Sequence, residues 1–273
     1  MTGLRSKRSG FVIVAHPEKK IAQETKARIT SWLEEKGQLV IADESSAHMA
    51  EFAVALGGDG MAVRTSTDFS VCGVITIPIN VGGDVGFITI GNLANWRKVL
   101  ESIIKGKYVR EERVGLEVIF RGESYGPFVN DDVLKHTSSM GTFRVRIDNH
   151  VVYRGLRADG MIVSAPTGST GYNMSAGGPV VVPGLECILL TPLCPDQFGA
   201  KPVVMKQDSL IEVEIVGTKT SGGMCLIADG QSVGEIGVGE SVIVRQHKTR
   251  VLFAVLNRRD FFTALHKKKG LMR

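Results

Sequence analysis

The hydrophobic pattern of this 273-residue chain changes near Tyr108, and this change restricts the folds that the chain can adopt. Before Tyr108, short apolar runs typical of buried strands alternate with longer stretches typical of helices. The expected strands are Phe11–Ala15, Leu39–Ala42, Phe52–Leu56 and Val74–Ile77, and the expected helices are Glu18–Lys36 and Asn92–Lys105. Strands that alternate with helices need crossover connections, which predicts a largely parallel, Rossmann-like sheet.

Beyond Tyr108 the apolar runs are short and rich in β-branched residues, with Gly, Asn and Asp between them. The runs are Gly115–Phe120, Phe128–Leu134, Thr142–Ile147, Val151–Leu156, Met161–Ser164, Cys187–Thr191, Ser209–Val216, Met224–Ala228, Ser241–Arg245 and Arg250–Val255. This pattern is typical of an all-β antiparallel sandwich. Arg259–Lys269 is helical again. We therefore expect an α/β domain over residues 1–107, completed by residues 256–273, and an all-β sandwich domain over residues 108–255.

The net charge of +5 does not indicate a nucleic-acid partner, because it belongs to the two ends of the chain. Residues 1–8 and 258–273 together carry eight net positive charges, which leaves the remaining chain with a net charge of −3. Basic termini are typically solvated. The apolar runs stay well short of the roughly 18–20 residues that span a bilayer, so no membrane partner is expected either.

Cysteine and histidine usage favours a cytoplasmic protein without a structural metal. The four cysteines form no CxxC pair, and the six histidines show no spacing typical of a zinc site. A strand-like run, rather than the apolar helix of a signal peptide, follows the basic N-terminus. We therefore expect reduced cysteines, a cytoplasmic location and no metal ligand from the protein.

The 32 glycines, about 12% of the chain against a usual ~7%, are a stronger signal than the charge. Gly57-Gly58-Asp59-Gly60 follows an expected strand and precedes a stretch that can begin a helix. Such a loop lets a phosphate approach the backbone amides at the start of a helix. The Asp59 carboxylate would repel that phosphate unless it serves another purpose, such as accepting a hydroxyl proton or binding magnesium. A tight Asp-Gly turn without function is the alternative.

Three further segments carry polar side chains directly after apolar runs. The densest is Ala165–Pro179, which combines several glycines with hydroxyl residues and Tyr172. Hydroxyl and amide groups can hydrogen-bond ribose and phosphate, and a tyrosine ring can stack on a flat ring. A flexible linker is the alternative. The other two segments, Asn130–Asp132 and Asp229–Gln231, are equally compatible with polar turns.

Taken in order, these motifs resemble those of the NAD kinase family. GGDG is followed by PINVGGDVGFIT, FVNDDV, DGMIVSAPTGSTGYNMSAGGPV, TPLCP, ADGQ and RRDFFTALHKKKG, so that the resemblance covers about residues 11 to 270. It implies ATP-dependent phosphorylation of the adenosine-ribose 2′-hydroxyl of NAD, which gives NADP. It also implies an α/β domain and a β-sandwich with the site between them, a homodimer or homotetramer, and Mg²⁺ that arrives with ATP.

The resemblance also implies roles for individual residues. Asp59 matches the general base, with Gly58 and Gly60 around it. Asn130 and Asp131 match a pair that contacts ribose hydroxyls, and Arg157 and Asp159 match positions near the nicotinamide. The other positions that match the dinucleotide-binding segments are Thr167, Thr170, Gly171, Tyr172, Asn173, Ser175 and Gln231.

The chain departs from the family pattern in several places. Pro78-Ile79-Asn80 stands where Gly-Ile-Asn is common, and Met61–Arg64 replaces a Thr/Ser-Leu-Leu/Phe-Arg run. Asp196-Gln197-Phe198 replaces His-Ser-Leu, and Gly171 is often alanine. The loss of a histidine and the gain of a carboxylate leave the phosphoryl donor open, with ATP, other nucleotides and polyphosphate as candidates.

Two other functions compete with that of a NAD kinase. Lipid kinases share the GGDG loop, but the PTGST and DGQ segments fit the dinucleotide family better, and no membrane-binding helix is evident. A catalytically weak NAD(P)-binding regulatory protein is suggested by the change at Asp196–Phe198. The presence of Asp59 argues against it, because a protein without catalytic function could lose this residue.

Overall fold

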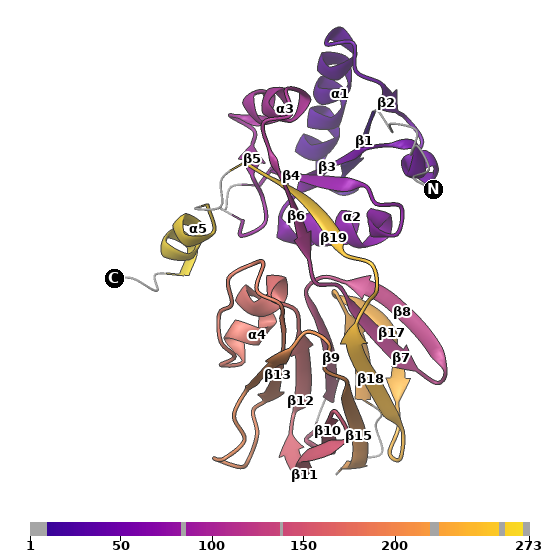
Figure 1. The fold of residues 1–273 in the computed structure, drawn as a ribbon, viewed down its shortest axis with the longest axis vertical. Helices are drawn as coiled ribbons and strands as arrows, with labels where there is room; N and C mark the ends of the chain where they lie inside the picture. Colours follow the sequence, from indigo (N-terminus) through magenta and orange to yellow (C-terminus); the bar gives the residue numbers. More distant parts are fainter. Residues whose placement is uncertain (1–9, 83–85, 137–138, 219–223, 257–259, 270–273) are drawn as a thin grey trace, which may run out of the picture. The chain divides into compact units, whose positions relative to one another are not determined.

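A computed structural model describes residues 10–82, 86–136, 139–218, 224–256 and 260–269 of the chain (Figure 1). The chain forms two compact units, of which the first contains residues 1–112 and 251–273 and the second residues 113–250. The polypeptide therefore leaves the first unit once and returns to it.

The first unit is built on a seven-stranded sheet in the order β2-β1-β3-β4-β19-β6, with β5 paired to β4. Its strands are β1 (Phe11–Ala15), β2 (Val40–Ile41), β3 (Phe52–Gly57), β4 (Ile75–Asn80), β5 (Gly91–Asn92), β6 (Val109–Arg113) and β19 (Val251–Val255). The pairs of β1 with β2 and β3, and of β4 with β3, β5 and β19, are all parallel. This confirms the predicted parallel sheet. The strands β3, β4 and β19 are buried throughout, as expected for strands covered on both faces.

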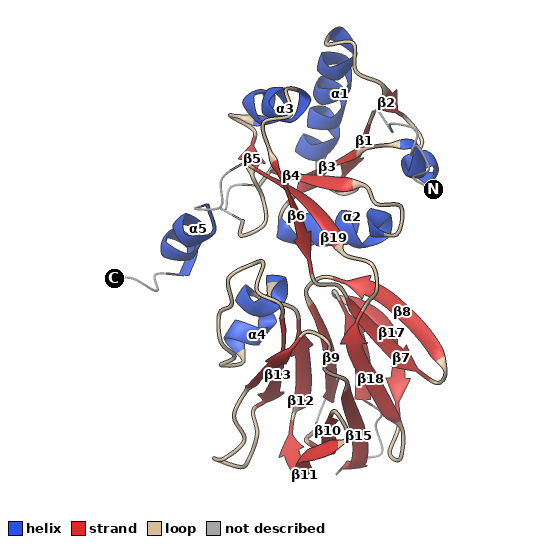
Figure 2. Cartoon of the chain, viewed as in Figure 1, coloured by secondary structure: helices blue, strands red, loops and turns tan. Residues whose placement is uncertain are grey.

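Helices cover both faces of this sheet (Figure 2). They are α1 (Lys20–Glu35), η1 (Glu44–Met49), α2 (Asp59–Ser70) and α3 (Trp96–Ile104). The helix α5 (Asp260–Lys269) packs through Phe261 against Phe87, in the loop that follows β4. The helices α1 and α3 share one hydrophobic cluster, in which Trp32 and Trp96 pack edge to face with ring centroids 5.6 Å apart. Gly37 and Gly106 end these two helices in the left-handed conformation that glycine favours, with φ of 70° and 68°. The sequence predicts both of these helix ends.

Residues 108–112 and 251–255 lie in the first unit, whereas the sequence analysis expected them in the second. The reason is strand pairing. β6 and β19 are hydrogen-bonded neighbours in the parallel sheet, and β19 also pairs with β4, where Phe253 lies opposite Thr76. The α5 helix follows β19 in the chain and belongs to the same unit, as expected.

The second unit contains two six-stranded antiparallel sheets, in the orders β11-β10-β15-β18-β7-β8 and β14-β13-β12-β9-β16-β17. Their strands are β7 (Leu116–Phe120), β8 (Glu123–Phe128), β9 (Asp131–His136), β10 (Gly141–Ile147), β11 (His150–Ala158), β12 (Gly160–Ser164), β13 (Cys187–Leu193), β14 (Val203–Lys206), β15 (Ile211–Thr218), β16 (Met224–Ala228), β17 (Gln231–Ile236) and β18 (Ser241–Gln246). Two short helical segments, η2 (Thr167–Thr170) and α4 (Tyr172–Ser175), follow β12. The predicted all-β architecture is confirmed.

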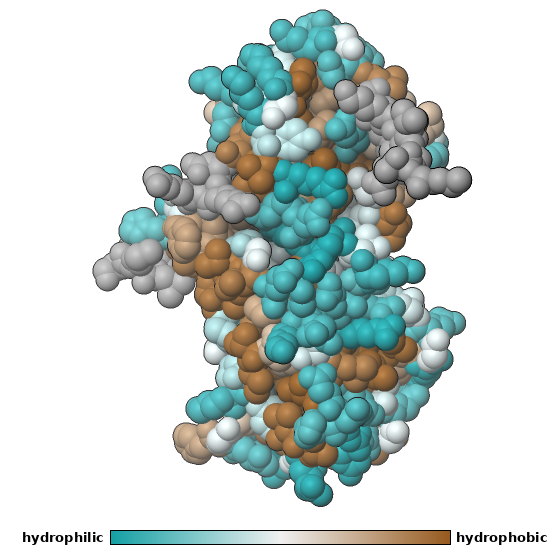
Figure 3. All heavy atoms as spheres, viewed as in Figure 1, coloured by the Kyte–Doolittle hydropathy of each residue, from teal (hydrophilic) through white to brown (hydrophobic). Residues whose placement is uncertain are grey.

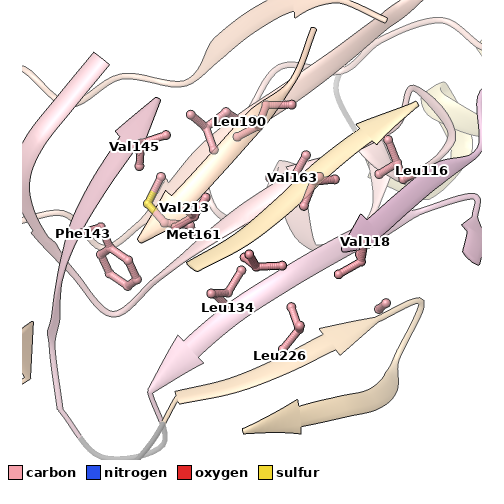
Figure 4. Close-up of a cluster of buried hydrophobic side chains, with 14 of the residues drawn as sticks. Leu116, Val118, Leu134, Phe143, Val145, Met161, Val163, Leu190, Val213 and Leu226 are labelled. Carbon is pink, nitrogen blue, oxygen red and sulfur yellow. The ribbon is translucent and has the colours of Figure 1, made fainter. Parts of the chain in front are cut away.

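A hydrophobic core in the second unit contains side chains from both sheets (Figure 4). Leu116 and Val118 of β7 contribute from one sheet, and Leu134 of β9 and Val163 of β12 from the other. Buried and partly exposed residues alternate along β7, which is the pattern of a strand covered on one face. Each fully buried leucine or valine contributes about 1.5–3 kcal/mol to stability, so this core holds the sheets in a defined register.

The expected strand Phe128–Leu134 is divided in the structure. β8 ends at Phe128 and β9 begins at Asp131. Between them, the backbone N–H groups of Val129 and Asn130 donate to the carboxylate of Asp229, each at 2.8 Å. The hydrophobic run is therefore interrupted by a turn at Val129 and Asn130, which the Asp229 side chain stabilises. The hydrophobic pattern does not predict β5, β6, β14 or β17, and of β8 it predicts only Phe128.

The surface carries both hydrophilic and hydrophobic side chains, and the mean hydropathy of the whole chain is nearly neutral, at +0.09. On the face drawn in Figure 3, hydrophilic side chains cover most of the protein, and hydrophobic residues form separate patches. Across the described ranges, no helix has the length and hydropathy needed to cross a membrane.

Candidate functional site

In the first unit, the glycine-rich loop connects the end of β3 to the start of α2. Gly57 ends the strand, Gly58 precedes the helix in an extended conformation and Asp59 is the first helical residue. A Cβ atom on Gly57 would lie 2.3 Å from the Cβ of Met61, so only glycine allows this tight entry into the helix. Gly57 also lies opposite Asn80, the last residue of β4, so the carboxyl ends of two parallel strands meet at this loop. Ligands of open α/β sheets bind at this edge.

The Asp59 carboxylate is held by the loop that follows β4. Its Oδ2 accepts a hydrogen bond from the backbone N–H of Phe87 at 2.8 Å, and its Oδ1 accepts one from Ile88 at 3.2 Å. Gly86 packs directly against this carboxylate, because a Cβ on Gly86 would lie 2.2 Å from Oδ1 of Asp59. Gly86, Phe87 and Ile88, at the end of that sequence motif, thus fix the orientation of Asp59. Sequence reasoning selected both motifs but not their contact.

In the second unit, two of the predicted segments meet at Asp229. This residue forms the turn between β16 and β17, where Asp229 and Gly230 have φ of 45° and 78°. Its carboxylate accepts hydrogen bonds from the backbone N–H groups of Val129, Asn130 and Asp131. Sequence reasoning missed this role of Asp229, although the ADGQ motif and the turn were both recognised.

Burial and charge perturb the neighbouring carboxyl groups. Burial raises the pKa of Asp131 to about 7, and the nearby Asp229 carboxylate adds to this effect. Asp132 is fully buried, and neither of its oxygens has a hydrogen-bond partner in the described part of the structure. Its pKa is raised well above the usual range, mainly by burial and then by Asp229 and Asp131. Asp131 and Asp132 therefore keep their protons at a pH at which ordinary aspartates are ionised.

The raised pKa of Asp131 predicts a pH-dependent stability. The folded state binds the proton more tightly than the unfolded state does, so the stabilisation is complete below about pH 4 and is lost as the pH rises through about 7. Relative to the Asp131→Asn variant, the wild type should therefore lose up to about 1.4 kcal/mol of unfolding free energy for each pH unit in this window. Urea unfolding from pH 5 to 8 measures the difference. The exposed Asp208→Asn variant is the control, and parallel pH curves for wild type and Asp131→Asn would contradict the prediction.

The PTGST segment packs against the Asn130 turn. The backbone carbonyl of Asn130 accepts hydrogen bonds from the N–H of Ala165 at 2.9 Å and from the hydroxyl of Ser164 at 3.1 Å. A Cβ on Gly168 would lie 2.3 Å from this same carbonyl oxygen. The glycine is therefore needed for close packing. It brings the segment that begins at Thr167 against the segment that carries Asn130 and Asp131.

The predicted residues of this segment differ in exposure. Thr167 and Thr170 are buried, whereas Gly171 and Ser175 are exposed. Tyr172 is 42% exposed, so its ring is available to a ligand. Gln231, at the start of β17, is also exposed.

The Asn173 side chain forms hydrogen bonds within the protein. Its side chain is completely buried. Nδ2 donates to the carbonyl oxygens of Ser169 and Pro179, and Oδ1 accepts from the hydroxyl of Thr191 at 2.7 Å. The side chain therefore joins α4 to β13 and to the loop that follows α4, which gives Asn173 a positioning role.

The remaining predicted pair lies near the end of β11. Arg157 forms an ion pair with Asp196, with 3.2 Å between Nη1 and Oδ2, and the backbone N–H of Asp196 donates to the carbonyl of Arg157. Asp159 is exposed. Asp196, one of the departures from the family pattern, thus contacts one of the residues matched to the nicotinamide end.

Comparison with known proteins agrees with this picture. The model of the ATP-NAD kinase C-terminal domain matches residues 132–255. A NAD kinase of Methanothermobacter thermautotrophicus is 33% identical over 221 residues, covering 80% of this chain and 76% of the relative. A NAD kinase of Photorhabdus laumondii is 30% identical over 279 residues, covering 94% of each chain.

Two solved structures are also similar. The NAD kinase of Archaeoglobus fulgidus in complex with ATP has a TM-score of 0.76 and 26% sequence identity, covering 94% of this chain and 98% of that one. Yeast NADH kinase in complex with NADH has a TM-score of 0.83, covering 97% of this chain and 88% of that one. At 20% identity, it supports the fold alone.

A parallel α/β unit with a glycine-rich loop, joined to a β-sandwich with a second glycine-rich segment, defines a two-domain nucleotide-binding protein. The relatives make the assignment more specific. The chain belongs to the NAD kinase family, and it is an enzyme.

Proposed function

We propose that this enzyme transfers the γ-phosphoryl group of ATP to the adenosine-ribose 2′-hydroxyl of NAD, giving NADP and ADP. The names of its relatives support the reaction, and the complex of the Archaeoglobus fulgidus NAD kinase with ATP supports ATP as a ligand. The observation that carries the proposal is the Asp59 carboxylate at the glycine-rich start of α2, held by two backbone N–H groups.

Asp59 acts as the general base in this proposal. The 2′-oxygen of NAD attacks the γ-phosphorus, the bond between this phosphorus and the β,γ-bridging oxygen breaks, and the hydroxyl proton passes to Asp59. Phosphoryl transfer depends mainly on positioning and on charge stabilisation. The hydrogen bonds from Phe87 and Ile88 fix the carboxylate before the substrate arrives, which lowers the cost of orienting it.

The second unit holds the dinucleotide. Asn130 and Asp131 contact ribose hydroxyls, and Thr167, Thr170, Gly171 and Ser175 line the ligand together with Gln231. Arg157 and Asp159 face the nicotinamide end. Asn173 holds the segment in shape from inside the protein. Gly58 and Gly60, in the first unit, let phosphate groups approach the start of α2.

Magnesium enters with the nucleotide. Within the described part of the chain, no group of three or more His, Cys, Asp and Glu side chains could hold a metal ion. We assign Mg²⁺ to the substrate, as the usual companion of ATP phosphates.

Replacing Tyr172 by alanine is expected to raise the Kd for NAD about 5- to 150-fold, because stacking on an aromatic ring contributes about 1–3 kcal/mol for each base. The ring is partly exposed at the start of α4. Isothermal titration with NAD measures the effect, and Tyr172→Phe, which keeps the ring, is the matched control. An unchanged affinity in Tyr172→Ala would count against the stacking role.

The experiment that tests the proposed function is incubation of the purified protein with Mg-ATP and NAD, with NADP detected by an NADP-specific dehydrogenase. Parallel reactions contain other nucleoside triphosphates, inorganic polyphosphate, or NADH as acceptor. Formation of NADP supports the proposal. No product with any donor would instead favour the NAD(P)-binding regulatory protein.

We further propose a cytoplasmic homodimer or homotetramer. The resemblance to the family supports the assembly, and four free cysteines agree with a reducing compartment. Light scattering of the purified protein measures the oligomeric state.

A further inference from the structure

Four hydrogen bonds join Asp229 to the chain from Val129 to Asp131. The Asp229 carboxylate accepts the backbone N–H groups of Val129, Asn130 and Asp131, at 2.8, 2.8 and 3.2 Å. The backbone N–H of Asp229 in turn donates to the carbonyl of Asp131 at 2.9 Å. Successive N–H groups that converge on one side chain need a strong acceptor, and a carboxylate forms shorter and stronger hydrogen bonds than a neutral group does.

A two-residue turn presents this carboxylate. Ala228 lies opposite Gln231 at the ends of β16 and β17, so Asp229 and Gly230 form the whole connection. Their φ of 45° and 78° are typical of a tight hairpin turn, in which aspartate followed by glycine is a favoured pair. The β16 strand also pairs with β9, where Ala228 lies opposite Asp132. Asp229 is therefore fixed at the end of the strand that lies beside β9.

The backbone of Asn130 is held on its other side as well. Its carbonyl oxygen accepts hydrogen bonds from the end of β12 and from the residue that follows, so both polar groups of this peptide backbone are bonded to distant parts of the chain. Oδ2 of Asp131 lies near Gly171 at the start of α4, 3.9 Å from the position of a Cβ there. The Asp131 side chain thus faces the glycine-rich segment, on a backbone that Asp229 holds in place.

We propose that Asp229 is a positioning residue for the phosphoryl acceptor, because its carboxylate holds the backbone of Asn130 and Asp131 so that both side chains meet the ribose hydroxyls of NAD. This inference rests on the proposed function, which assigns these two side chains to the ribose. Asp229 acts through the turn and takes no part in proton transfer. The arrangement requires a carboxylate, because an amide would present one oxygen and one NH₂ group to the three N–H donors.

The first test compares Asp229→Asn with wild type in steady-state kinetics. Asparagine tolerates the left-handed backbone conformation, so the turn is kept, but its NH₂ group faces at least one of the backbone N–H donors. The KM for NAD should rise about 10-fold or more, as expected when a hydrogen bond to a charged group is lost. The KM for ATP should stay within about twofold of the wild-type value, because the change affects the acceptor only.

Asp148 provides the matched controls. It also lies in a hairpin turn with a left-handed backbone, at φ of 50°, and its carboxylate accepts the backbone N–H of Leu210 at 2.9 Å. Neither residue is a predicted site residue. Asp148→Asn removes a charge from an equivalent turn, and Asp148→Ala removes the hydrogen bond and strains the backbone. Asp148→Ala should lower the free energy of unfolding, and both variants should leave the KM for NAD within about twofold.

NMR spectroscopy gives two readouts that a general loss of stability would not change. The Asp229 charge contributes to the raised pKa of Asp131, so a carboxyl titration should give a lower pKa for Asp131 in Asp229→Asn and an unchanged one in Asp148→Asn. In the wild type, the backbone amide signals of Asn130 and Asp131 should shift when NAD binds. Signals that bound NAD leaves unchanged would overturn the inference without the need for any variant.

Calorimetry with NAD alone measures the same effect without turnover. A weaker NAD affinity in Asp229→Asn than in Asp148→Asn supports the inference. Equal affinities, with NADP still formed, would overturn it and leave the proposed function intact. If the wild type makes no NADP, the proposed function fails by itself. NAD binding that depends on Asp229 would then still support the positioning role, and NAD binding that is independent of Asp229 or absent from the wild type would overturn it.

Discussion

Replacing Asp59 by asparagine is expected to lower kcat about 10²–10⁴-fold, the usual contribution of a general base. Asparagine has nearly the same shape but cannot accept the proton of the 2′-hydroxyl. It also presents an NH₂ group to one of the two backbone N–H donors of Phe87 and Ile88, so the local loop loses one hydrogen bond. NAD binding should persist, because the predicted dinucleotide segments lie in the other unit.

Two measurements separate the loss of a base from damage to the loop. The free energy of unfolding of Asp59→Asn should stay within about 1.5 kcal/mol of the wild-type value, as expected for the loss of one hydrogen bond, while kcat falls by the full factor. Asp68→Asn, on the exposed face of the same helix, is the control and should retain turnover within about twofold. Comparable kcat values for wild type and Asp59→Asn would exclude the base assignment.

The second large effect is expected for Gly168→Ala. The added methyl group would lie 2.3 Å from the Asn130 carbonyl oxygen and 2.5 Å from its carbon, and both belong to the backbone. Because backbone atoms cannot rotate away, the turn must shift, at a cost of about 1–3 kcal/mol. The shift also displaces Asn130 and Asp131, so the KM for NAD should rise at least about 10-fold.

Gly155→Ala is the matched control, because a Cβ at this β11 position meets no other atom within 4 Å. Its free energy of unfolding should stay within about 0.5 kcal/mol of the wild-type value. Urea unfolding and NAD kinetics of both variants measure the contrast. Equal stability of Gly168→Ala and Gly155→Ala would contradict the packing argument.

Asp132 shows where sequence reasoning stops. In the sequence it is the third residue of a polar cluster, for which an exposed turn is the simplest interpretation. In the structure it is a β9 residue with an exposed fraction of 0% and no hydrogen-bond partner among the described atoms. Its burial depends on β12 and β16, which lie on either side of β9. The residues next to Asp132 in the sequence do not predict that β12 and β16 will lie beside it.

Asn173 is a second residue whose role the sequence does not reveal. Its place in a Gly/Ser/Thr-rich motif predicts contact with a ligand, yet Ser169, Pro179 and Thr191 occupy its amide. Thr191 lies 18 residues away, on β13. Sequence motifs select residues that matter, but they do not separate a residue that binds the ligand from one that shapes the binding segment.

The sequence by itself determined the two architectures and the loops that carry the candidate chemistry. Hydrophobic periodicity reports local burial, and glycine-rich turns after apolar runs mark where parallel or antiparallel strands end. Only the tertiary structure decided the partners of the carboxylates. The Asp59 carboxylate accepts hydrogen bonds from residues that lie 28 and 29 positions later in the chain. The Asp229 carboxylate accepts hydrogen bonds from residues that lie 98 to 100 positions earlier. Those contacts follow from the order of strands in the sheets, which depends on packing over the whole unit and leaves no local pattern in the sequence.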